Sequence, residues 1–383
     1  MSRIASFKNA LFELQRVCLS RNIAFVTFCL PDSMEICTFI QYKSQPQFIG
    51  SLLQIDSQSG FILAPFFQNE KFPIYLLKPD RILYGYGVDE DIIEELRAVK
   101  GQNEGFSAPF GSVYECPKDE FLQQAKTIKN AIQSGSLDKA VLSRIYLAGN
   151  NFNLEGPEIF NALLEKNPNA FRYLLNIPNA GTWTGATPEP LLKVHDTVIE
   201  TVSLAGTQKL NGVQVGEVEW HTKEIEEQKI VTAFIENLLD DFGITNYFKN
   251  GPDSQQAANL VHLKSTFSFN RTSLKQTLGE FLSALHPTPS VCGLPKDHAF
   301  DLIHLLEKHD RAYYTGFLGP LNFSGSSNLF VNLRCLRVLQ HEFALFAGAG
   351  ITSGSDVDNE WEETELKLQT LLSVLNNPDR DYE

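Results

Sequence analysis

The segment IAFVTFCLPDSMEICTFIQY, residues 23–42, joins two runs of β-branched and aromatic residues through the short polar turn PDS. Runs of this kind, separated by a few turn-forming residues, predict antiparallel hairpins. The pattern continues through the runs GFILAPFF, FPIYLL and RILYGYG, with the turn signals DSQSG and KPD between them. Strands in adjacent groups favour large antiparallel sheets flanked by helices over a doubly wound fold, so we expect the α+β class.

Helical patterns surround these strands. An amphipathic pattern covers residues 4–20, DEDIIEELRAVK follows the last hairpin strand, and KDEFLQQAKTIKNAIQSG precedes the predicted strand KAVLSRIYLA. The stretch 102–112 is rich in Gly, Ser and Pro and is the best candidate for a boundary. It separates an N-terminal β-rich segment, residues 1–115, from a main region, residues 116–375, and we expect both to form one continuous structural domain. Further helices are predicted at 157–166, 219–243, 273–285, 296–309 and 358–374.

Composition and charge narrow the class of partner. The 383 residues carry 32 basic and 46 acidic side chains, a formal net charge of −14, which repels phosphate backbones and anionic membranes. We therefore expect no nucleic-acid and no membrane partner. The six cysteines show no zinc-finger spacing, and the N-terminus lacks the apolar core of a signal peptide. A cytoplasmic protein, monomeric by default, is the expectation.

Two acidic segments carry carboxylates at helical spacing. Glu224 and Glu227 in KEIEEQKIVT are three residues apart, as are Glu360 and Glu363 in EWEETELKL, where Lys367 lies a further turn along. Two such helices facing each other supply the carboxylate oxygens that Mg²⁺ prefers and leave positions for water and substrate. The alternative is a pair of solvated helix faces with salt bridges along each helix.

Charged residues also interrupt apolar strands. Lys139 in LDKAVLSR and Arg334 in VNLRCL must be paired, exposed at an edge, or functional. A buried lysine whose pKa is lowered by desolvation becomes a plausible general base. The alternative for both residues is a side chain on the wet face of a sheet. His262 and His286 are similar cases, since single histidines are commonly hydrogen-bonded core residues.

Glycine-rich segments form a further set. GTWTGATPEP contains Gly185 and Glu189, SLAGTQ contains Gly206, and LFAGAGITSGS contains Gly348 and Gly350. We interpret these segments as turns whose backbone N–H groups can hold an anion, with ordinary β-turns as the alternative. None has the lysine or the helix context of a nucleotide-binding fingerprint.

Ten segments, taken in chain order, resemble segments of the chorismate-utilising enzymes. They are LDKAVLSR, GATPEPLL, SLAGT, KEIEEQKIVT, HLKSTF, LHPTPSVCGLPK, FLGPL, NLRC, FAGAGI and EWEETELKL. The resemblance covers roughly residues 116–375 and is greatest to isochorismate synthases. It implies the two-lobed fold of anthranilate synthase component I, with large antiparallel sheets and the active site between the lobes. It also implies an isomerase that adds water at C2 of chorismate and expels the C4 hydroxyl.

The resemblance assigns roles to residues. Lys139 matches the base that activates water, and Glu189 matches the acid that protonates the departing hydroxyl. Glu227 and Glu363 match direct ligands of Mg²⁺, the implied cofactor. Glu224 and Glu360 match residues that hold metal-bound water. The residues that match positions binding the two substrate carboxylates are Gly206, Thr207, Arg334, Gly350 and Lys367. His262 and Tyr314 match residues that line the substrate cleft.

Differences within the family favour isochorismate synthesis. Lys139 disfavours relatives that install an amine, and Leu204 disfavours aminodeoxychorismate synthase, whose nucleophilic lysine occupies that position. The HPTP motif, 286–289, is absent from most salicylate synthases, although Ser290 after it is usually Ala in isochorismate synthases.

Two alternatives stay open beside that interpretation. Tyr314 and Leu333 resemble the salicylate enzymes, so isochorismate formation followed by pyruvate elimination is the alternative reaction. A non-catalytic protein that binds chorismate is the alternative from a different class. The sequence also leaves open whether the product enters menaquinone or siderophore biosynthesis.

Overall fold

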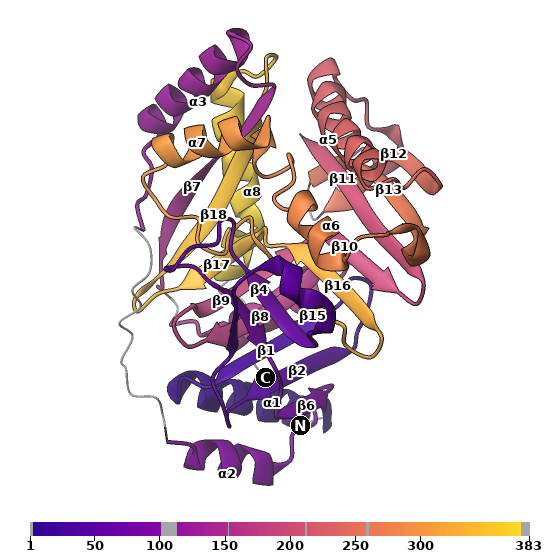
Figure 1. Ribbon diagram of the computed structural model, residues 1–383. Helices are drawn as coiled ribbons and strands as arrows, with labels where there is room; N and C mark the ends of the chain where they lie inside the picture. Colours follow the sequence, from indigo (N-terminus) through magenta and orange to yellow (C-terminus); the bar gives the residue numbers. More distant parts are fainter. Residues whose placement is uncertain (1–2, 101–112, 152, 211–212, 258–259, 377–383) are drawn as a thin grey trace.

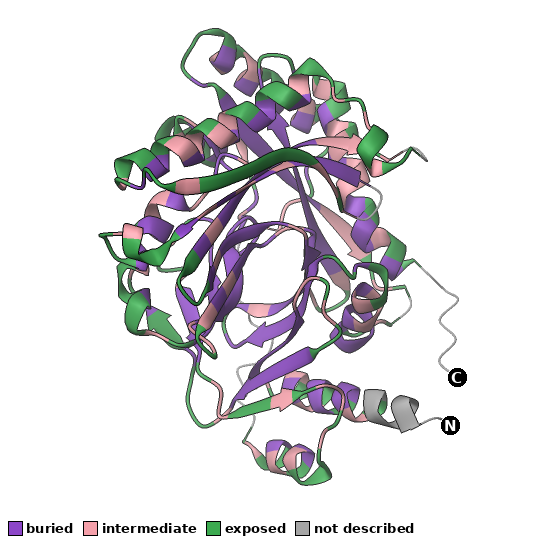
Figure 2. Ribbon diagram, turned by 90° about the vertical axis from the view of Figure 1, so that its right-hand side faces the viewer, coloured by how far each residue is buried: buried purple, intermediate pink, exposed green. Residues whose placement is uncertain are grey.

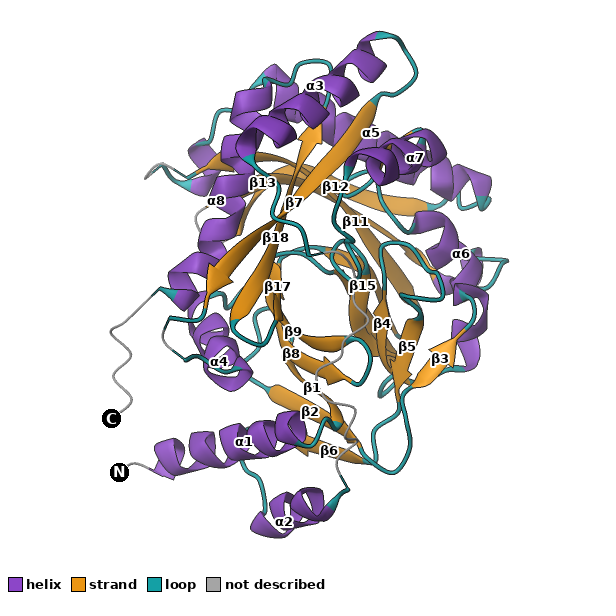
Figure 3. Ribbon diagram, turned by 90° about the vertical axis from the view of Figure 1, so that its left-hand side faces the viewer, coloured by secondary structure: helices purple, strands orange, loops and turns teal. Residues whose placement is uncertain are grey.

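The computed structural model describes residues 3–100, 113–151, 153–210, 213–257 and 260–376. Within these ranges the strands form two nine-stranded sheets, and every pairing between neighbouring strands is antiparallel. Helices lie on the outer faces of the sheets, and strands occupy the centre of the molecule (Figure 3). The α+β class with large antiparallel sheets is therefore confirmed.

The first sheet contains strands from both ends of the chain, because β1 pairs with β8 and β18 pairs with β7. In spatial order its strands are β14 (Gly293–Leu294), β7 (Lys139–Gly149), β18 (Glu342–Ile351), β17 (Cys335–Val338), β9 (Gly181–Thr187), β8 (Phe171–Ile177), β1 (Ala24–Cys29), β2 (Ile36–Gln41) and β6 (Arg81–Tyr84).

The second sheet also joins distant segments, because β4 pairs with β15. In spatial order its strands are β12 (Tyr247–Ala257), β13 (Leu260–Asn270), β11 (Val198–Lys209), β10 (Pro190–His195), β16 (Ser326–Val331), β15 (Phe317–Leu321), β4 (Gly60–Ala64), β5 (Ile74–Leu77) and β3 (Gln47–Ile49).

The helices divide between the two halves of the molecule seen in Figure 1. Helix α8 packs on β18, and α3 packs beside α8, whereas α5 covers β11 and β13 on the other side. The helices are α1 (Arg3–Ser20), α2 (Glu90–Ala98), α3 (Lys118–Gln133), α4 (Gly156–Lys166), α5 (Thr222–Asp241), α6 (Leu278–Leu285), α7 (Lys296–Leu306) and α8 (Val357–Leu375).

An aromatic core joins the two sheets where they face each other. Phe171 of β8 in the first sheet stacks on Phe330 of β16 in the second, with ring centroids 4.4 Å apart. Phe28 and Phe61 extend this contact, and all four side chains are buried. The central strands are buried and the outer helix faces are exposed (Figure 2), so the sheets form the rigid frame that positions the site.

The N-terminal strands are shared between the sheets. β1, β2 and β6 extend the first sheet, whereas β3, β4 and β5 extend the second, so the N-terminal segment is built into the same two sheets as the main region. The predicted boundary at 102–112 lies outside the described residues. None of the helices in the described ranges of the chain is long and apolar enough to span a membrane.

The interpretation of the glycine-rich segments as turns was wrong for Gly185, Gly206, Gly348 and Gly350. GTWTGAT is strand β9, Gly206 lies in β11, and Gly348 and Gly350 lie in β18, whereas Gly354 lies in a turn after β18. Tertiary packing explains the glycine at Gly185, because a Cβ there would lie 2.8 Å from Cβ of Cys335 on the neighbouring strand β17. These glycines allow close approach within a sheet instead of forming turns.

Candidate active site

A cavity of about 70 Å³ lies between the two sheets. Strands β7 and β18 of the first sheet, strands β11 and β13 of the second, and helices α5 and α8 contribute to its wall. The structure therefore brings predicted residues from distant regions of the chain to one place. The predicted residues in the wall are Glu189, Gly206, Thr207, Glu227, His262, Tyr314, Arg334, Gly350 and Lys367.

Lys139, the predicted base, lies directly behind this wall. Its side chain is fully buried, and its Nζ is 2.8 Å from Oε1 of Glu227 on α5. Gly350 of β18 makes the contact possible, since a Cβ there would lie 2.4 Å from the same oxygen and 3.0 Å from Cε of Lys139. Strand β18 thus leaves room for a lysine and a carboxylate to meet between the sheets.

Glu189, the predicted acid, lies between β9 and β10 and is buried. Burial raises the pKa of its carboxyl to about 8, although the positive charges of Lys139 and Lys367 and a hydrogen bond from Ser290 act in the opposite direction. The carboxyl therefore holds its proton at neutral pH, as a general acid requires. Glu189 and the predicted substrate-binding residue Lys367 both line the cavity.

The predicted metal ligands on α8 are paired with lysines. Nζ of Lys367 lies 2.6 Å from Oε1 of Glu363, and Nζ of Lys223 lies 2.5 Å from Oε1 of Glu360. Burial opposes ionisation of Glu363, but Lys367 and Lys223 outweigh it and lower its pKa. Within the described residues, no three acidic, histidine or cysteine side chains are grouped so that they could hold a metal ion.

Lys223 is a functional candidate that the sequence analysis missed. Burial lowers its pKa, but the charges of Glu360, Glu363 and Glu227 outweigh that effect and raise it overall, so one ammonium lies among carboxylates of both α5 and α8. Lys223 precedes Glu227 by four residues on α5, and this spacing was the available signal.

The acidic helices fit a divalent cation for two reasons. A positive group, the Lys223 ammonium, contacts Glu360, and the charges of Glu363 and Glu227 also raise its pKa, so carboxylates of both helices act on one cation. The fourth, Glu224, is buried on the same face of α5 as Glu227, while Glu226 is exposed. Oxygen donors of this kind are the ligands that Mg²⁺ prefers.

Gly206 shapes the opposite wall through a β-bulge in β11. The register with β13 shifts between Ala205 and Thr207, and Gly206 has φ of +68°. A Cβ at this position would lie 2.9 Å from Cβ of Glu224, so glycine permits α5 to approach the strand. Beside the bulge, Nδ1 of His262 lies 3.1 Å from the carbonyl oxygen of Gly206 and 3.2 Å from Oγ1 of Thr207.

Arg334 closes the end of the cavity near α8. Its Nη1 donates to the carbonyl oxygen of Lys367 at 3.2 Å and to Oγ1 of Thr370 at 3.1 Å. Burial lowers the pKa of Arg334 to about 10, so the guanidinium remains charged at neutral pH. Tyr314 lines the same cavity, and burial raises the pKa of its hydroxyl, which remains a neutral hydrogen-bonding group.

Comparison with known proteins identifies the family. A family model described as chorismate binding enzyme matches residues 89–376. The chain belongs to the chorismate-binding enzyme family. This match covers both acidic helices, the cavity and strands of both sheets, so the predicted family is confirmed.

The similar sequences of this family include named isochorismate synthases. The chain is 26% identical over 262 residues to a vibriobactin-specific isochorismate synthase of Vibrio cholerae, covering 67% of this chain and 66% of that protein. It is 28% identical over 244 residues to an isochorismate synthase of Escherichia coli strain K12, covering 62% of each. The matches thus span slightly less than two thirds of these relatives' own length.

The fold is shared over a longer stretch than the sequence. A crystal structure described as a putative 2,3-dihydroxybenzoate-specific isochorismate synthase from Bacillus anthracis superimposes with a TM-score of 0.75. It covers 94% of this chain and 99% of that chain at 21% sequence identity. The predicted two-lobed fold of the chorismate-utilising enzymes is therefore confirmed, while the roles of single residues remain predictions.

Proposed function

We propose that this protein is an isomerase that converts chorismate to isochorismate in the presence of Mg²⁺. One observation carries the proposal: a buried carboxyl, Glu189, whose pKa is raised by burial, lines the cavity, and the buried Lys139 lies directly behind the wall of the same cavity. A proton acceptor and a proton donor at one cavity are the two groups that this exchange of hydroxyl groups needs.

Substrate binding depends on cations in the cavity wall. Chorismate carries two carboxylates, and Arg334 and Lys367 are charged groups that can bind them. Lys367 also contacts Glu363, so it lies between the substrate-binding wall and the acidic helix. Mg²⁺, held by Glu227 and Glu363 with help from Glu224 and Glu360, would offset negative charge on the ring carboxylate during the reaction.

The two protons move through different residues. In its neutral form, Lys139 takes a proton from water as the water oxygen forms a bond to C2, and both conjugated ring double bonds shift by one position along the ring, away from C2 and towards C4. Glu189 donates its proton to the C4 hydroxyl as the C4–O bond breaks, so that the hydroxyl leaves as water. One water enters and one leaves, so the reaction is an isomerisation and needs no redox or nucleotide cofactor.

The proposal is tested by incubating the purified protein with chorismate, with Mg²⁺ and after removal of metal by a chelator, and separating the products by chromatography. We expect isochorismate with Mg²⁺ and loss of product after chelation. Salicylate together with pyruvate would support the alternative reaction, in which pyruvate is eliminated after isochorismate forms. Unchanged chorismate that nevertheless binds to the protein would support a non-catalytic binding role.

A further inference from the structure

His262 presents an unsatisfied ring nitrogen at the cavity. It lies on β13 opposite Thr207 of β11, and its side chain is 6% exposed. Nδ1 is 3.1 Å from the carbonyl oxygen of Gly206, whereas Nε2 is buried and has no hydrogen-bond partner among the described residues. A buried polar atom without a partner is uncommon in native structures and points to a missing ligand.

The surroundings determine which nitrogen carries the proton. A carbonyl oxygen only accepts hydrogen bonds, so Nδ1 donates to Gly206 and the neutral imidazole has its lone pair at Nε2. Burial, followed by the positive charges of Arg334 and Lys367, lowers the pKa of His262 to about 3. The ring is therefore neutral throughout the physiological pH range, and Nε2 can only accept a hydrogen bond.

The two cationic side chains in the cavity wall do not donate a hydrogen bond to Nε2 of His262. Arg334 donates to the carbonyl oxygen of Lys367, and the ammonium of Lys367 contacts Glu363 and the carbonyl oxygen of Gly348. A ligand that satisfies Nε2 must itself carry an O–H or N–H group. Chorismate is a dianion at neutral pH, and its ring hydroxyl is then its one hydrogen-bond donor.

We infer that Nε2 of His262 accepts a hydrogen bond from the ring hydroxyl of the bound ligand. This inference rests on the proposed function and assigns His262 as a positioning residue. Turning the O–H group towards His262 leaves the lone pairs of the hydroxyl oxygen free for the proton of Glu189, which lines the same cavity. The site thereby selects ligands with a hydroxyl over those without one.

The test compares two unreactive chorismate analogues with reduced ring double bonds, identical except that one has hydrogen in place of the 4-hydroxyl. Calorimetry with Mg²⁺ measures both dissociation constants. We expect the wild-type protein to bind the hydroxylated analogue about 5- to 50-fold more tightly, because the deoxy analogue leaves Nε2 unsatisfied. His262→Leu should reduce this ratio to about one, and His262→Gln, which keeps an acceptor, should restore some of it.

His286 provides the matched control. It is a second buried histidine with a lowered pKa, of about 4, but its Nε2 contacts the carbonyl oxygen of Pro65 outside the cavity. His286→Leu should change thermal stability without changing the affinity ratio of the two analogues. A ratio that persists in His262→Leu, or that disappears in His286→Leu, contradicts the inference.

Nitrogen NMR of the imidazole identifies the donor directly. We expect the Nε2 resonance of His262 to shift on binding of the hydroxylated analogue and to remain unchanged with the deoxy analogue. An equal shift with both would identify water as the donor and overturn the inference. If the wild-type protein forms isochorismate but binds both analogues equally, the inference about His262 fails alone, whereas absence of isochorismate overturns the proposed function.

Discussion

Two buried ionic clusters in this molecule differ in how completely their groups are satisfied. In the first, at the cavity between the sheets, Nε2 of His262 has no partner among the described residues, and Glu227, Glu360 and Glu363 each contact one lysine. In the second, both oxygens of Glu307 accept from Arg311, and Oε1 also accepts from the backbone N–H of Ser143 at 2.7 Å. Oγ of Ser143 in turn contacts Nε2 of His309 at 2.9 Å.

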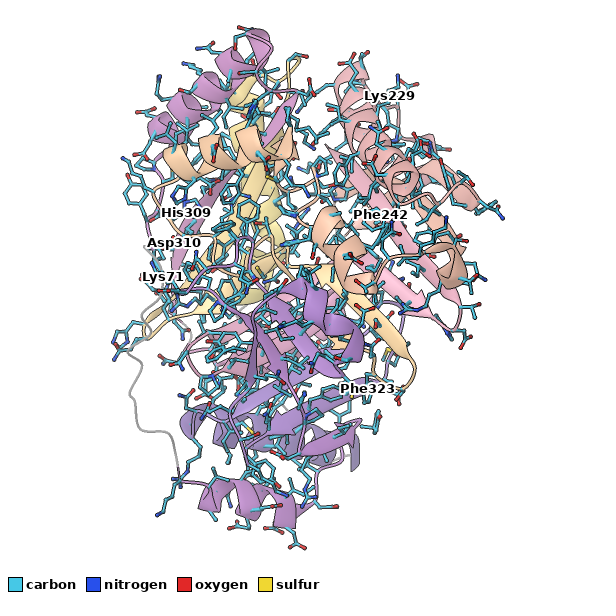
Figure 4. The ribbon with its side chains drawn as sticks, viewed as in Figure 1. Lys71, Lys229, Phe242, His309, Asp310 and Phe323 are labelled. Atoms are coloured by element: carbon cyan, nitrogen blue, oxygen red, sulfur yellow. The ribbon has the colours of Figure 1, made fainter. Side chains whose placement is uncertain are left out.

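The second cluster borders a larger cavity, of about 160 Å³, on the flank where Figure 4 labels His309 and Asp310. Burial opposes ionisation of Glu307, but the charge and hydrogen bonds of Arg311 lower its pKa. Both clusters combine buried charge with a cavity, so these two features alone do not distinguish the proposed active site from the second cluster. The difference lies in unsatisfied groups facing a cavity, which a ligand can complete.

The largest expected effect follows from removing the base at the first cluster. Lys139→Ala should lower kcat by about 100- to 10,000-fold, because the variant loses the proton acceptor for water. Binding of Mg²⁺ and chorismate should be largely retained, since Glu227 loses a lysine partner and remains available to the metal. Steady-state kinetics and calorimetry measure the two properties, and normal turnover would remove Lys139 from the mechanism.

A substitution in the second cluster should lower the stability of the protein and leave its turnover nearly unchanged. Glu307→Gln leaves the guanidinium of Arg311 buried without its carboxylate and should lower the free energy of unfolding by about 3–5 kcal/mol. Denaturant unfolding measures this loss, and kcat per folded molecule should stay within about twofold of wild type. A selective fall in kcat without loss of stability would show that the clusters are not functionally distinct.

The raised pKa of Glu189 predicts a pH dependence of activity and of stability. Turnover should fall about tenfold per pH unit above about 8, because the acid then loses its proton before it can donate it. The folded protein keeps this proton at pH values where the unfolded chain, with an ordinary pKa of 4.5, has lost it. Stability should therefore fall as pH rises from about 4.5 to about 8.

The variant Glu189→Gln separates the contribution of Glu189 to the pH dependence of stability from the contributions of other titrating groups. The variant should lose most of its turnover, and its stability should decline less between those pH values than that of the wild-type protein. Paired denaturant titrations at several pH values measure the difference. An identical pH dependence of stability in both proteins would contradict the raised pKa of Glu189.

The sequence predicted the strands and helices better than it predicted their arrangement. Helical spacing located the face of α5 that buries Glu224 and Glu227, because that periodicity is local. The distribution of the N-terminal strands between both sheets depends on pairings such as β4 with β15, which link residues more than 200 positions apart and leave no local signal.

The glycine-rich segments show the same limit at single residues. Gly185 is required by Cys335 on the next strand, and Gly350 by the contact between Lys139 and Glu227. The glycine content alone predicted turns. Only the neighbouring residues in the folded protein show that these glycines lie in strands whose backbone is in close contact with another strand or with side chains. For Lys223, the spacing from Glu227 was a local signal, but its contact with Glu360 joins two helices that are distant in the sequence.

The smallest expected effect tests whether a lysine in the first cluster competes with a divalent cation for the carboxylates. The ammonium of Lys223 lies among Glu360, Glu363 and Glu227, so a divalent cation must compete with it for the same carboxylates. Lys223→Met should therefore tighten Mg²⁺ binding by about two- to tenfold, measured by calorimetry of the metal-free protein, and lower the stability of that metal-free form. Lys249→Met removes an ion pair with Glu236 that is about one third exposed, and it should leave the affinity for Mg²⁺ unchanged. Weaker binding of Mg²⁺ to Lys223→Met would show that the lysine supports the carboxylates and does not stand in the position of the metal.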